Sequence, residues 1–194
     1  MRIIAGKCRG RILRSPGGST ANVGIRPTAD RVKEALFSIL GQRLRGAKVL
    51  DLYAGTGALG LEALSRGADS VVFVDSGTAA IELIKKNVEL CGFSERSTIT
   101  RRDLTRGLSF LPPLSPPGGF DLIFLDPPYR LGLVAQFLTG LAELPLLARD
   151  GMVVAEEGVE VELSENYPGL CQADRRHYGD TGIWFYQQSQ EEGA

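Results

Sequence analysis

The sequence contains few of the residues on which several kinds of site are built. Its 194 residues include one histidine, His177, and three cysteines, Cys8, Cys91 and Cys171, which lie far apart. A single histidine excludes catalysis by several histidines acting together. An odd number of widely spaced cysteines argues against a disulfide framework and against a zinc site, and it fits a reducing cytoplasm. We therefore expect a cytoplasmic protein with no metal.

Long hydrophobic runs are also missing. No apolar stretch approaches the roughly 20 residues that span a bilayer, and the first residues, MRIIAGKCRGR, contain no apolar signal core. Hydrophobic residues make up 43% of the chain and charged residues 23%, as in an ordinary globular protein. The length suits one medium-sized domain with a small appendage, and we expect a monomer without membrane contact.

Acidic residues are scarce at the start of the chain. Residues 1–48 hold eleven lysines and arginines against two acids, a balance of +9, whereas the rest of the chain carries −10. A basic arm on an acidic body indicates a polyanionic partner such as nucleic acid, although a charge run can also serve solubility alone. The bases that we assign to RNA phosphates are Arg2, Lys7, Arg9, Arg11, Arg14, Arg26 and Arg31.

The order of the expected elements indicates an α/β fold. Residues 2–5 and 11–14 flank the Gly-rich turn GKCRG and predict a small N-terminal β-hairpin, and a helix follows from about Thr28 to Leu40. From Lys48 onward, apolar strands alternate with helices, which predicts βαβ units and a mostly parallel sheet. The expected strands are 48–53, 70–75, 97–101, 120–125 and 151–156, the helices are 58–66, 77–90 and 131–142, and 104–111 is a weaker helical turn. Two last stretches, 170–178 and 183–188, flank the turn YGDTG and predict an antiparallel hairpin at the sheet edge.

The stretch VLDLYAGTGALG, Val49 to Gly60, contains G-x-G-x-x-G, the fingerprint of dinucleotide-binding proteins, and Asp75 follows Gly55 by 20 residues. Gly55 and Gly57 let the backbone approach a ligand closely. Asp51, however, lies where a dinucleotide would place its pyrophosphate, and a carboxylate there repels phosphate. It suits a cofactor with an ammonium and a sulfonium, S-adenosylmethionine. Asp75 can accept hydrogen bonds from the ribose of either cofactor, so the loop favours S-adenosylmethionine and leaves NAD open.

A second motif, FDLIFLDPPY from Phe120 to Tyr129, is an apolar strand that ends in Asp126, Pro127, Pro128 and Tyr129. Two prolines hold the backbone in rigid, extended geometry. The segment therefore fixes a carboxylate, the Pro127 carbonyl and an aromatic ring at the carboxyl end of a strand. Two acceptors can bind both N–H groups of an exocyclic amine, and the ring can stack on the base. This motif predicts methyl transfer to a base amine.

Together, MRIIAGKCRGR, RPTADRVKEALFSIL, VLDLYAGTGALGLEALSRGA, FVD and DLIFLDPPY resemble the RsmD family of bacterial methyltransferases. The resemblance runs from Met1 to about Tyr129 in strong blocks and continues more loosely to YGDTGI. It implies a class I S-adenosylmethionine-dependent methyltransferase with a Rossmann-like fold. It also implies methylation of the exocyclic N2 of a guanine in small-subunit (16S) ribosomal RNA, in assembled or partly assembled subunits.

The resemblance also implies a role for each motif residue. Asp51, Tyr53, Gly55 and Gly57 would line the methionine end of S-adenosylmethionine, Asp75 would hold its ribose, and Asp103 would reach its adenine amine. Ser76 and Leu104 belong to the same cofactor-binding set, and Asp126 to Tyr129 would form the target-base pocket. Asp75 stands where the family often has Glu, and Tyr53 and Thr56 stand where Phe and Ser are frequent. Residues 1–46 would be an RNA-docking extension and residues 47–194 the methyltransferase domain.

Two other functions stay open at this point. The DPPY motif alone does not separate guanine from adenine or RNA from DNA, so an adenine-N6 or other amino-methyltransferase is an alternative. DNA enzymes usually carry a separate target-recognition region, for which we find no room beyond residues 1–46 and short loops. An RNA-binding module without catalysis is the second alternative, and intact Asp51, Asp75 and DPPY disfavour it.

Overall fold

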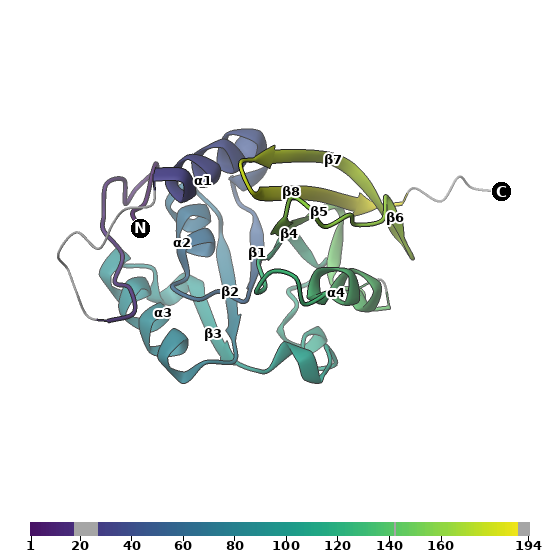
Figure 1. Cartoon of the computed structure of the whole chain (residues 1–194). Coiled ribbons are helices and arrows are strands. Elements are labelled where there is room, and N and C mark those ends of the chain that lie inside the picture. Colours follow the sequence, from purple (N-terminus) through teal and green to yellow (C-terminus); the bar gives the residue numbers. More distant parts are fainter. Residues whose placement is uncertain (18–26, 142, 190–194) are drawn as a thin grey trace. The chain divides into compact units, whose positions relative to one another are not determined.

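The computed structural model describes residues 1–17, 27–141 and 143–189, which fall into two compact units, Met1–Asp103 and Leu104–Ala194 (Figure 1). In the first unit, three strands pair in parallel in the order β3-β2-β1. They are β1 (Lys48–Leu52), β2 (Ser70–Asp75) and β3 (Ser97–Arg101). Val49 to Leu52 of β1 are all buried, as expected for a strand covered on both faces.

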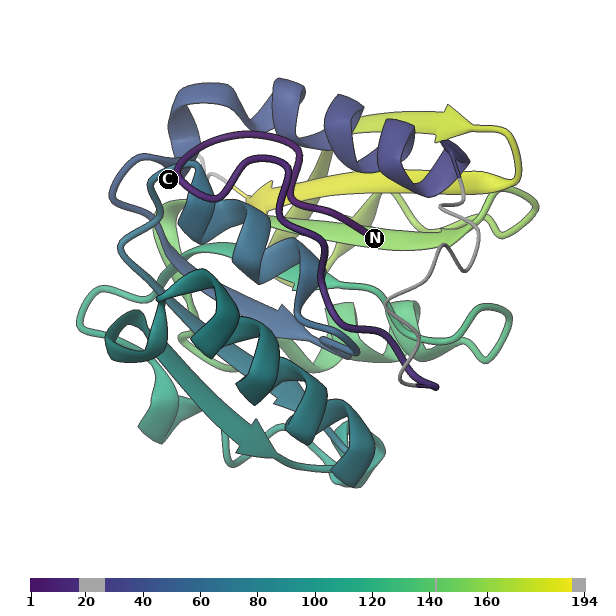
Figure 2. The ribbon, with the colours of Figure 1, turned by 90° about the vertical axis from the view of Figure 1, so that its left-hand side faces the viewer.

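Helices connect and cover these strands. They are α1 (Pro27–Leu40), α2 (Ala58–Ser65) and α3 (Thr78–Cys91), and the 3-10 turn η1 (Gly41–Leu44) follows α1 while η2 (Ser94–Arg96) precedes β3. α2 contacts β1 and β2, α3 contacts β2 and β3, and Figure 2 shows both helices on one face of these strands. Gly60 allows the close approach of α2, because a Cβ atom there would lie 2.4 Å from Cε1 of Phe73.

The N-terminal segment crosses over α2 in Figure 2 and buries Ile3 and Leu13. The predicted hairpin is present but short: Arg2 and Ile12 form an antiparallel bridge, and the amides of Ile3 and Leu13 donate to the carbonyls of Arg11 and Met1 over 2.9 and 3.0 Å. Other amides of the segment bind side chains of α2 and α3. The amides of Ile4 and Ala5 donate to the Glu62 carboxylate over 2.7 and 3.0 Å, and the Arg14 amide donates to the Asn87 side chain over 2.7 Å. Side chains of α2 and α3 therefore attach the hairpin to the helices.

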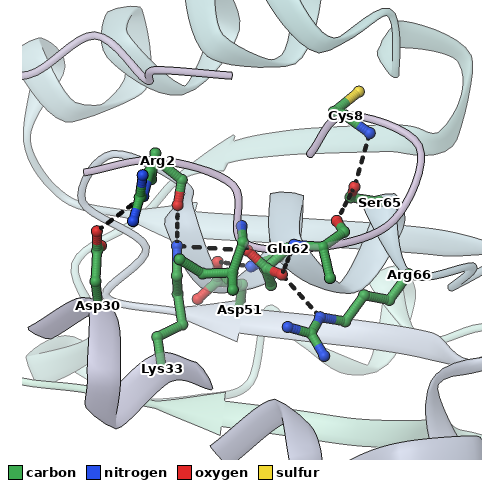
Figure 3. Close-up of polar contacts among 11 residues, drawn as sticks. Arg2, Cys8, Asp30, Lys33, Asp51, Glu62, Ser65 and Arg66 are labelled. Carbon is green, nitrogen blue, oxygen red and sulfur yellow. Dashed lines mark hydrogen bonds and ion pairs between the residues drawn. The ribbon is translucent and has the colours of Figure 1, made fainter. Parts of the chain in front are cut away.

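A buried charge cluster centres on Glu62, whose side chain is 0% exposed (Figure 3). Besides the two amides, its carboxylate contacts the Lys33 ammonium of α1 at 3.5 Å and Nε of Arg66 at 2.7 Å. Lys33 also donates to the Arg2 carbonyl over 2.6 Å. Burial lowers the pKa of the Lys33 ammonium, while the charges of Glu62 and Asp30 oppose that change. The cluster ties the N-terminal segment, α1 and α2 together.

The second unit contains a mixed sheet with strand order β4-β5-β8-β7-β6. β4 (Phe120–Leu125) and β5 (Leu147–Gly158) are parallel, and β6 (Asn166–Tyr167), β7 (Leu170–Tyr178) and β8 (Thr181–Gln188) add antiparallel pairs. The helical elements are α4 (Leu133–Leu141) and the 3-10 turns η3 (Leu104–Arg106) and η4 (Pro112–Leu114). Trp184, Phe185 and Tyr186 of β8 are buried. The C-terminal hairpin predicted from YGDTG is confirmed.

Some predicted bounds need correction. β5 begins at Leu147 rather than residue 151 and runs to Gly158, because Leu147 pairs with Phe120 and Gly158 pairs with Thr181. α4 starts at Leu133 rather than residue 131, since Arg130 and Gly132 adopt left-handed conformations with φ of 65° and 67°. The expected helical turn over 104–111 is only one 3-10 turn, Leu104–Arg106.

Within the described ranges, no helix is long and apolar enough to cross a membrane. The same residues contain no group of three or more His, Cys, Asp or Glu side chains placed to hold a metal ion.

Replacing Glu62 with alanine should destabilise the protein by about 3–5 kcal/mol, because Lys33 would remain buried without its partner. Adding Lys33→Met should recover part of that loss, because it removes the unpaired ammonium. Urea unfolding gives both free energies. Glu82→Ala is the control, since Glu82 pairs with Lys85 on the surface of α3, where its side chain is 51% exposed. Equal losses for Glu62→Ala and Glu82→Ala would contradict a structural role for the cluster.

Candidate active site

The glycine loop after β1 is held in a left-handed path by one carboxylate. Tyr53, Gly55 and Gly57 have φ values of 57°, 56° and 77°. The Asp75 carboxylate at the end of β2 accepts the amide of Gly55 over 2.9 Å and the amide of Gly77 over 2.8 Å. The space beside Gly55 is open, because the nearest atom to a Cβ there would be the Tyr53 carbonyl oxygen at 3.9 Å. A ligand can therefore approach the loop backbone at Gly55.

Asp51 lies deeper, with 1% of its surface exposed. One carboxylate oxygen accepts the amide of Gly60 in the first turn of α2 over 2.9 Å. Burial raises the pKa of this carboxyl to about 7, and the negative charge of Asp75 adds to the rise, while the Gly60 hydrogen bond opposes it. A cation bound beside Asp51 would offset the cost of its buried negative charge.

The other cofactor-site candidates of the first unit follow the strands. Tyr53 is half-buried, and burial together with the charge of Asp103 raises the pKa of its phenol. Ser76 and Asp103 are exposed directly after β2 and shortly after β3. The carboxyl ends of these parallel strands thus gather the candidates of the first unit, as the sequence predicted. Leu104 is buried and belongs to the second unit, so its contact with a cofactor stays a prediction.

The DPPY segment follows β4 in the second unit. Asp126 is half-buried, Pro127 is buried, and Pro128 is exposed. The Tyr129 hydroxyl donates to the Glu156 carboxylate of β5, and it lies 3.3 Å from Oγ1 of Thr181 at the start of β8. Tyr129 is nevertheless 37% exposed. Its hydroxyl is therefore held by the sheet while part of its side chain remains accessible.

Acids of β5 and of the turn after it also hold the next residue of this segment. The Arg130 amide donates to Oε1 of Glu157 over 3.0 Å, and that oxygen accepts the Gly158 amide over 2.9 Å. Nε of Arg130 contacts Oε1 of Glu160 at 2.6 Å. Sequence reasoning missed the partners Glu156, Glu157 and Thr181. Two consecutive acids in the apolar stretch MVVAEEG were the signal that could have identified the first two.

The basic residues assigned to RNA fall into three groups. Lys7, Arg9, Arg14 and Arg31 are exposed. Arg2 contacts Asp30 at 3.4 Å, and the Arg11 guanidinium donates to the Leu90 carbonyl at the end of α3. Arg26 lies outside the described residues. Arg2 and Arg11 are thus engaged within the protein, and contacts with RNA stay a prediction for all of them.

Replacing Asp51 with asparagine should change how stability depends on pH. Because folding raises the pKa of Asp51 from 3.8 to about 7, wild-type stability should fall as the pH rises through this range. The neutral amide avoids that loss, so we expect Asp51→Asn to gain up to about 4 kcal/mol over wild type above pH 7 and little near pH 4. Urea unfolding at several pH values measures the difference, with exposed Asp69→Asn as the control. A difference that does not vary with pH would contradict the raised pKa.

Comparisons with known proteins agree with the resemblance in sequence. The sequence model of one family, described as conserved hypothetical protein 95, matches residues 1–187. YlbH of Bacillus subtilis (strain 168) is 38% identical over 187 residues, which cover 96% of this chain and 98% of YlbH. Ribosomal RNA small subunit methyltransferase D of Escherichia coli (strain K12) is 35% identical over 160 residues, which cover 82% of this chain and 76% of that protein.

Solved structures share the fold. YhhF from Escherichia coli matches with a TM-score of 0.80 and 31% identity, covering 98% of this chain and 99% of YhhF. SMU.776, solved in complex with SAH, matches with a TM-score of 0.61 and 17% identity over 80% of this chain and 48% of its own, and this likeness shows the fold alone. The predicted class I methyltransferase fold, mostly parallel with C-terminal antiparallel strands, is confirmed. From the family model and the two sequence relatives, the chain belongs to the RsmD family.

Proposed function

We propose that this protein transfers a methyl group from S-adenosylmethionine to the exocyclic N2 of a guanine in small-subunit (16S) ribosomal RNA, in assembled or partly assembled subunits. The observation that carries the proposal is the DPPY segment, in which Tyr129 is anchored through its hydroxyl yet remains 37% exposed. The relative named ribosomal RNA small subunit methyltransferase D supports the RNA substrate. We place this reaction in the cytoplasm and propose that the protein acts as a monomer.

The residues around the glycine loop fit S-adenosylmethionine. Asp51 is a buried carboxylate without a cation among the partners described for it, and the ammonium or sulfonium of the cofactor would supply one. Asp75 uses one hydrogen bond on each oxygen for the loop, and a carboxylate oxygen can accept a second from a ribose hydroxyl. When bound, the cofactor supplies an electrophilic methyl group. Tyr53, Gly55, Gly57, Ser76 and Asp103 would complete its site, together with Leu104.

The residues of the DPPY segment would then bind and position the target guanine. The lone pair of the guanine amine is delocalised into the ring, which makes the amine a weak nucleophile. We assign to the Asp126 carboxylate and the Pro127 carbonyl the two N–H groups of that amine, which draws the nitrogen towards tetrahedral geometry. Pro128 keeps the segment rigid, and Tyr129 stacks on the base. Holding the amine in line with the methyl group supplies much of the rate.

Asp126→Ala should lower methyl transfer at least about 100-fold, because the carboxylate contact strengthens in the transition state. Its affinity for S-adenosylmethionine should stay within about twofold of wild type. Transfer of labelled methyl groups to naked 16S RNA, to small subunits and to DNA measures activity, and mapping the modified base identifies guanine or adenine. Calorimetric titration with S-adenosylmethionine, its demethylated product and NAD measures affinity, with the exposed Glu143→Ala as the control variant.

Several outcomes would contradict this proposal. Near-normal turnover of Asp126→Ala would remove its catalytic role. Methylated adenine or DNA would establish the alternative amino-methyltransferase. RNA binding by a wild-type protein that transfers no methyl group would leave only a binding module, and NAD binding alone would indicate an oxidoreductase.

We further propose that residues 1–46 dock the RNA, because the remainder of the chain is acidic and would repel phosphates. Arg11 and Arg2 have contacts within the protein, so the sharper test uses Lys7 and Arg9, which are exposed. Lys7→Ala with Arg9→Ala should weaken RNA binding and reduce its salt slope by about one to two log units per tenfold salt. Lys85→Ala with Lys86→Ala changes the net charge equally on α3 and is the control. If both double variants change RNA affinity and salt slope equally, the charges of residues 1–46 serve solubility and do not dock the RNA.

A further inference from the structure

Two consecutive glutamates follow the buried apolar residues of β5 near the end of this strand. Met152 to Ala155 are buried, and Glu156 and Glu157 follow them, with Glu157 only 1% exposed. Placing carboxylates at such a position is unfavourable unless they gain hydrogen bonds or charged partners. Both find donors in the residues directly after the two prolines of the DPPY segment, the Tyr129 hydroxyl and the Arg130 amide.

The contact between Glu156 and Tyr129 has a defined direction. Burial raises the pKa of Tyr129, and the hydrogen bond to Glu156 raises it further, so the phenol stays protonated and donates. Burial likewise raises the pKa of Glu156, while the hydrogen bond from Tyr129 lowers it. Thr181 contacts the same hydroxyl at 3.3 Å. Two neighbouring strands, β5 and β8, therefore hold one end of the Tyr129 side chain.

This arrangement restricts the motion of the ring. The backbone is fixed at Arg130, where φ is 65° and the amide is bound to Glu157, and the side chain is fixed at its hydroxyl. A tyrosine whose hydroxyl is bound cannot swing about χ1 without breaking the contacts with Glu156 and Thr181. A base that stacks on the ring meets a side chain that is already in place, so less freedom is lost on binding.

We propose that Glu156 is a positioning residue for methyl transfer, which acts by holding the Tyr129 hydroxyl and thereby keeping the ring in place under the target base. The role rests on the proposed function, since it requires a base stacked on Tyr129. Glu157 orients the same segment through the Arg130 amide. Glu160 contacts the Arg130 side chain rather than its backbone amide, and we assign it no such role.

A double-mutant cycle tests this proposal. Glu156→Ala should lower kcat about tenfold with an unchanged KM for S-adenosylmethionine, because only the base is misplaced. Tyr129→Phe should have a similar effect, and the double variant should lose no more than either single variant. Glu156→Gln keeps an oxygen that can accept the hydroxyl and should retain most of the wild-type kcat. Glu160→Gln, which alters an exposed acid beside Arg130, is the control and should match wild type.

Thermal unfolding of each variant shows whether a loss of kcat reflects a loss of folded protein. Effects that multiply in the double variant would show that Glu156 does not act through Tyr129 and would overturn the proposal, as would wild-type kcat in Glu156→Ala. A wild-type protein that methylates no RNA would instead overturn the proposed function, and this role with it. The wild-type assay therefore separates the two failures.

Discussion

The buried carboxylate of Glu62 attaches the N-terminal segment, residues 1–17, and α1 to α2. Its oxygens accept hydrogen bonds from two backbone amides of the N-terminal segment, and they form ion pairs with Lys33 of α1 and with Arg66. Because Glu62 lies on α2, these contacts attach the segment to the helix that begins at the glycine loop. An isolated buried carboxylate would be costly, and here four donors surround it. The same ion cluster thus fixes the arm and supports the helix that carries the proposed cofactor loop.

Carboxylates play a corresponding part at the glycine loop and at the DPPY segment. Asp75 holds the glycine loop through two amides, Asp51 holds the first turn of α2, and Glu157 holds the residue after DPPY. In each case an acid binds a backbone N–H at a turn that regular secondary structure leaves without a partner. These acids therefore shape the loops, and in our proposal Asp51 and Asp75 would also interact with the bound cofactor.

The sequence predicts the parts of this structure that depend on local pattern. The strands at 70–75, 97–101 and 120–125 agree with β2, β3 and β4, because apolar alternation and flanking turns determine a strand locally. The hairpin at the N-terminus is also present, but its length was overestimated, since the amides of Ile4 and Arg14 bind the distant side chains of Glu62 and Asn87. Glu156 and Thr181 were missed for the same reason. Nothing near Tyr129 in the chain shows that its hydroxyl will meet strands 27 and 52 residues further on.

The charge asymmetry of the chain agrees with the proposed function. The proposed site for a cationic cofactor and a base amine uses acidic acceptors, and the region after residue 48 carries −10. An RNA backbone would be repelled by that charge, and attraction must come from elsewhere in the chain. The first 48 residues supply it with +9, yet Lys33 is buried against Glu62, and Arg2 and Arg11 make contacts within the protein. Some bases of the arm therefore make contacts within the fold, while Lys7 and Arg9 are exposed and are the ones that we propose to meet phosphate.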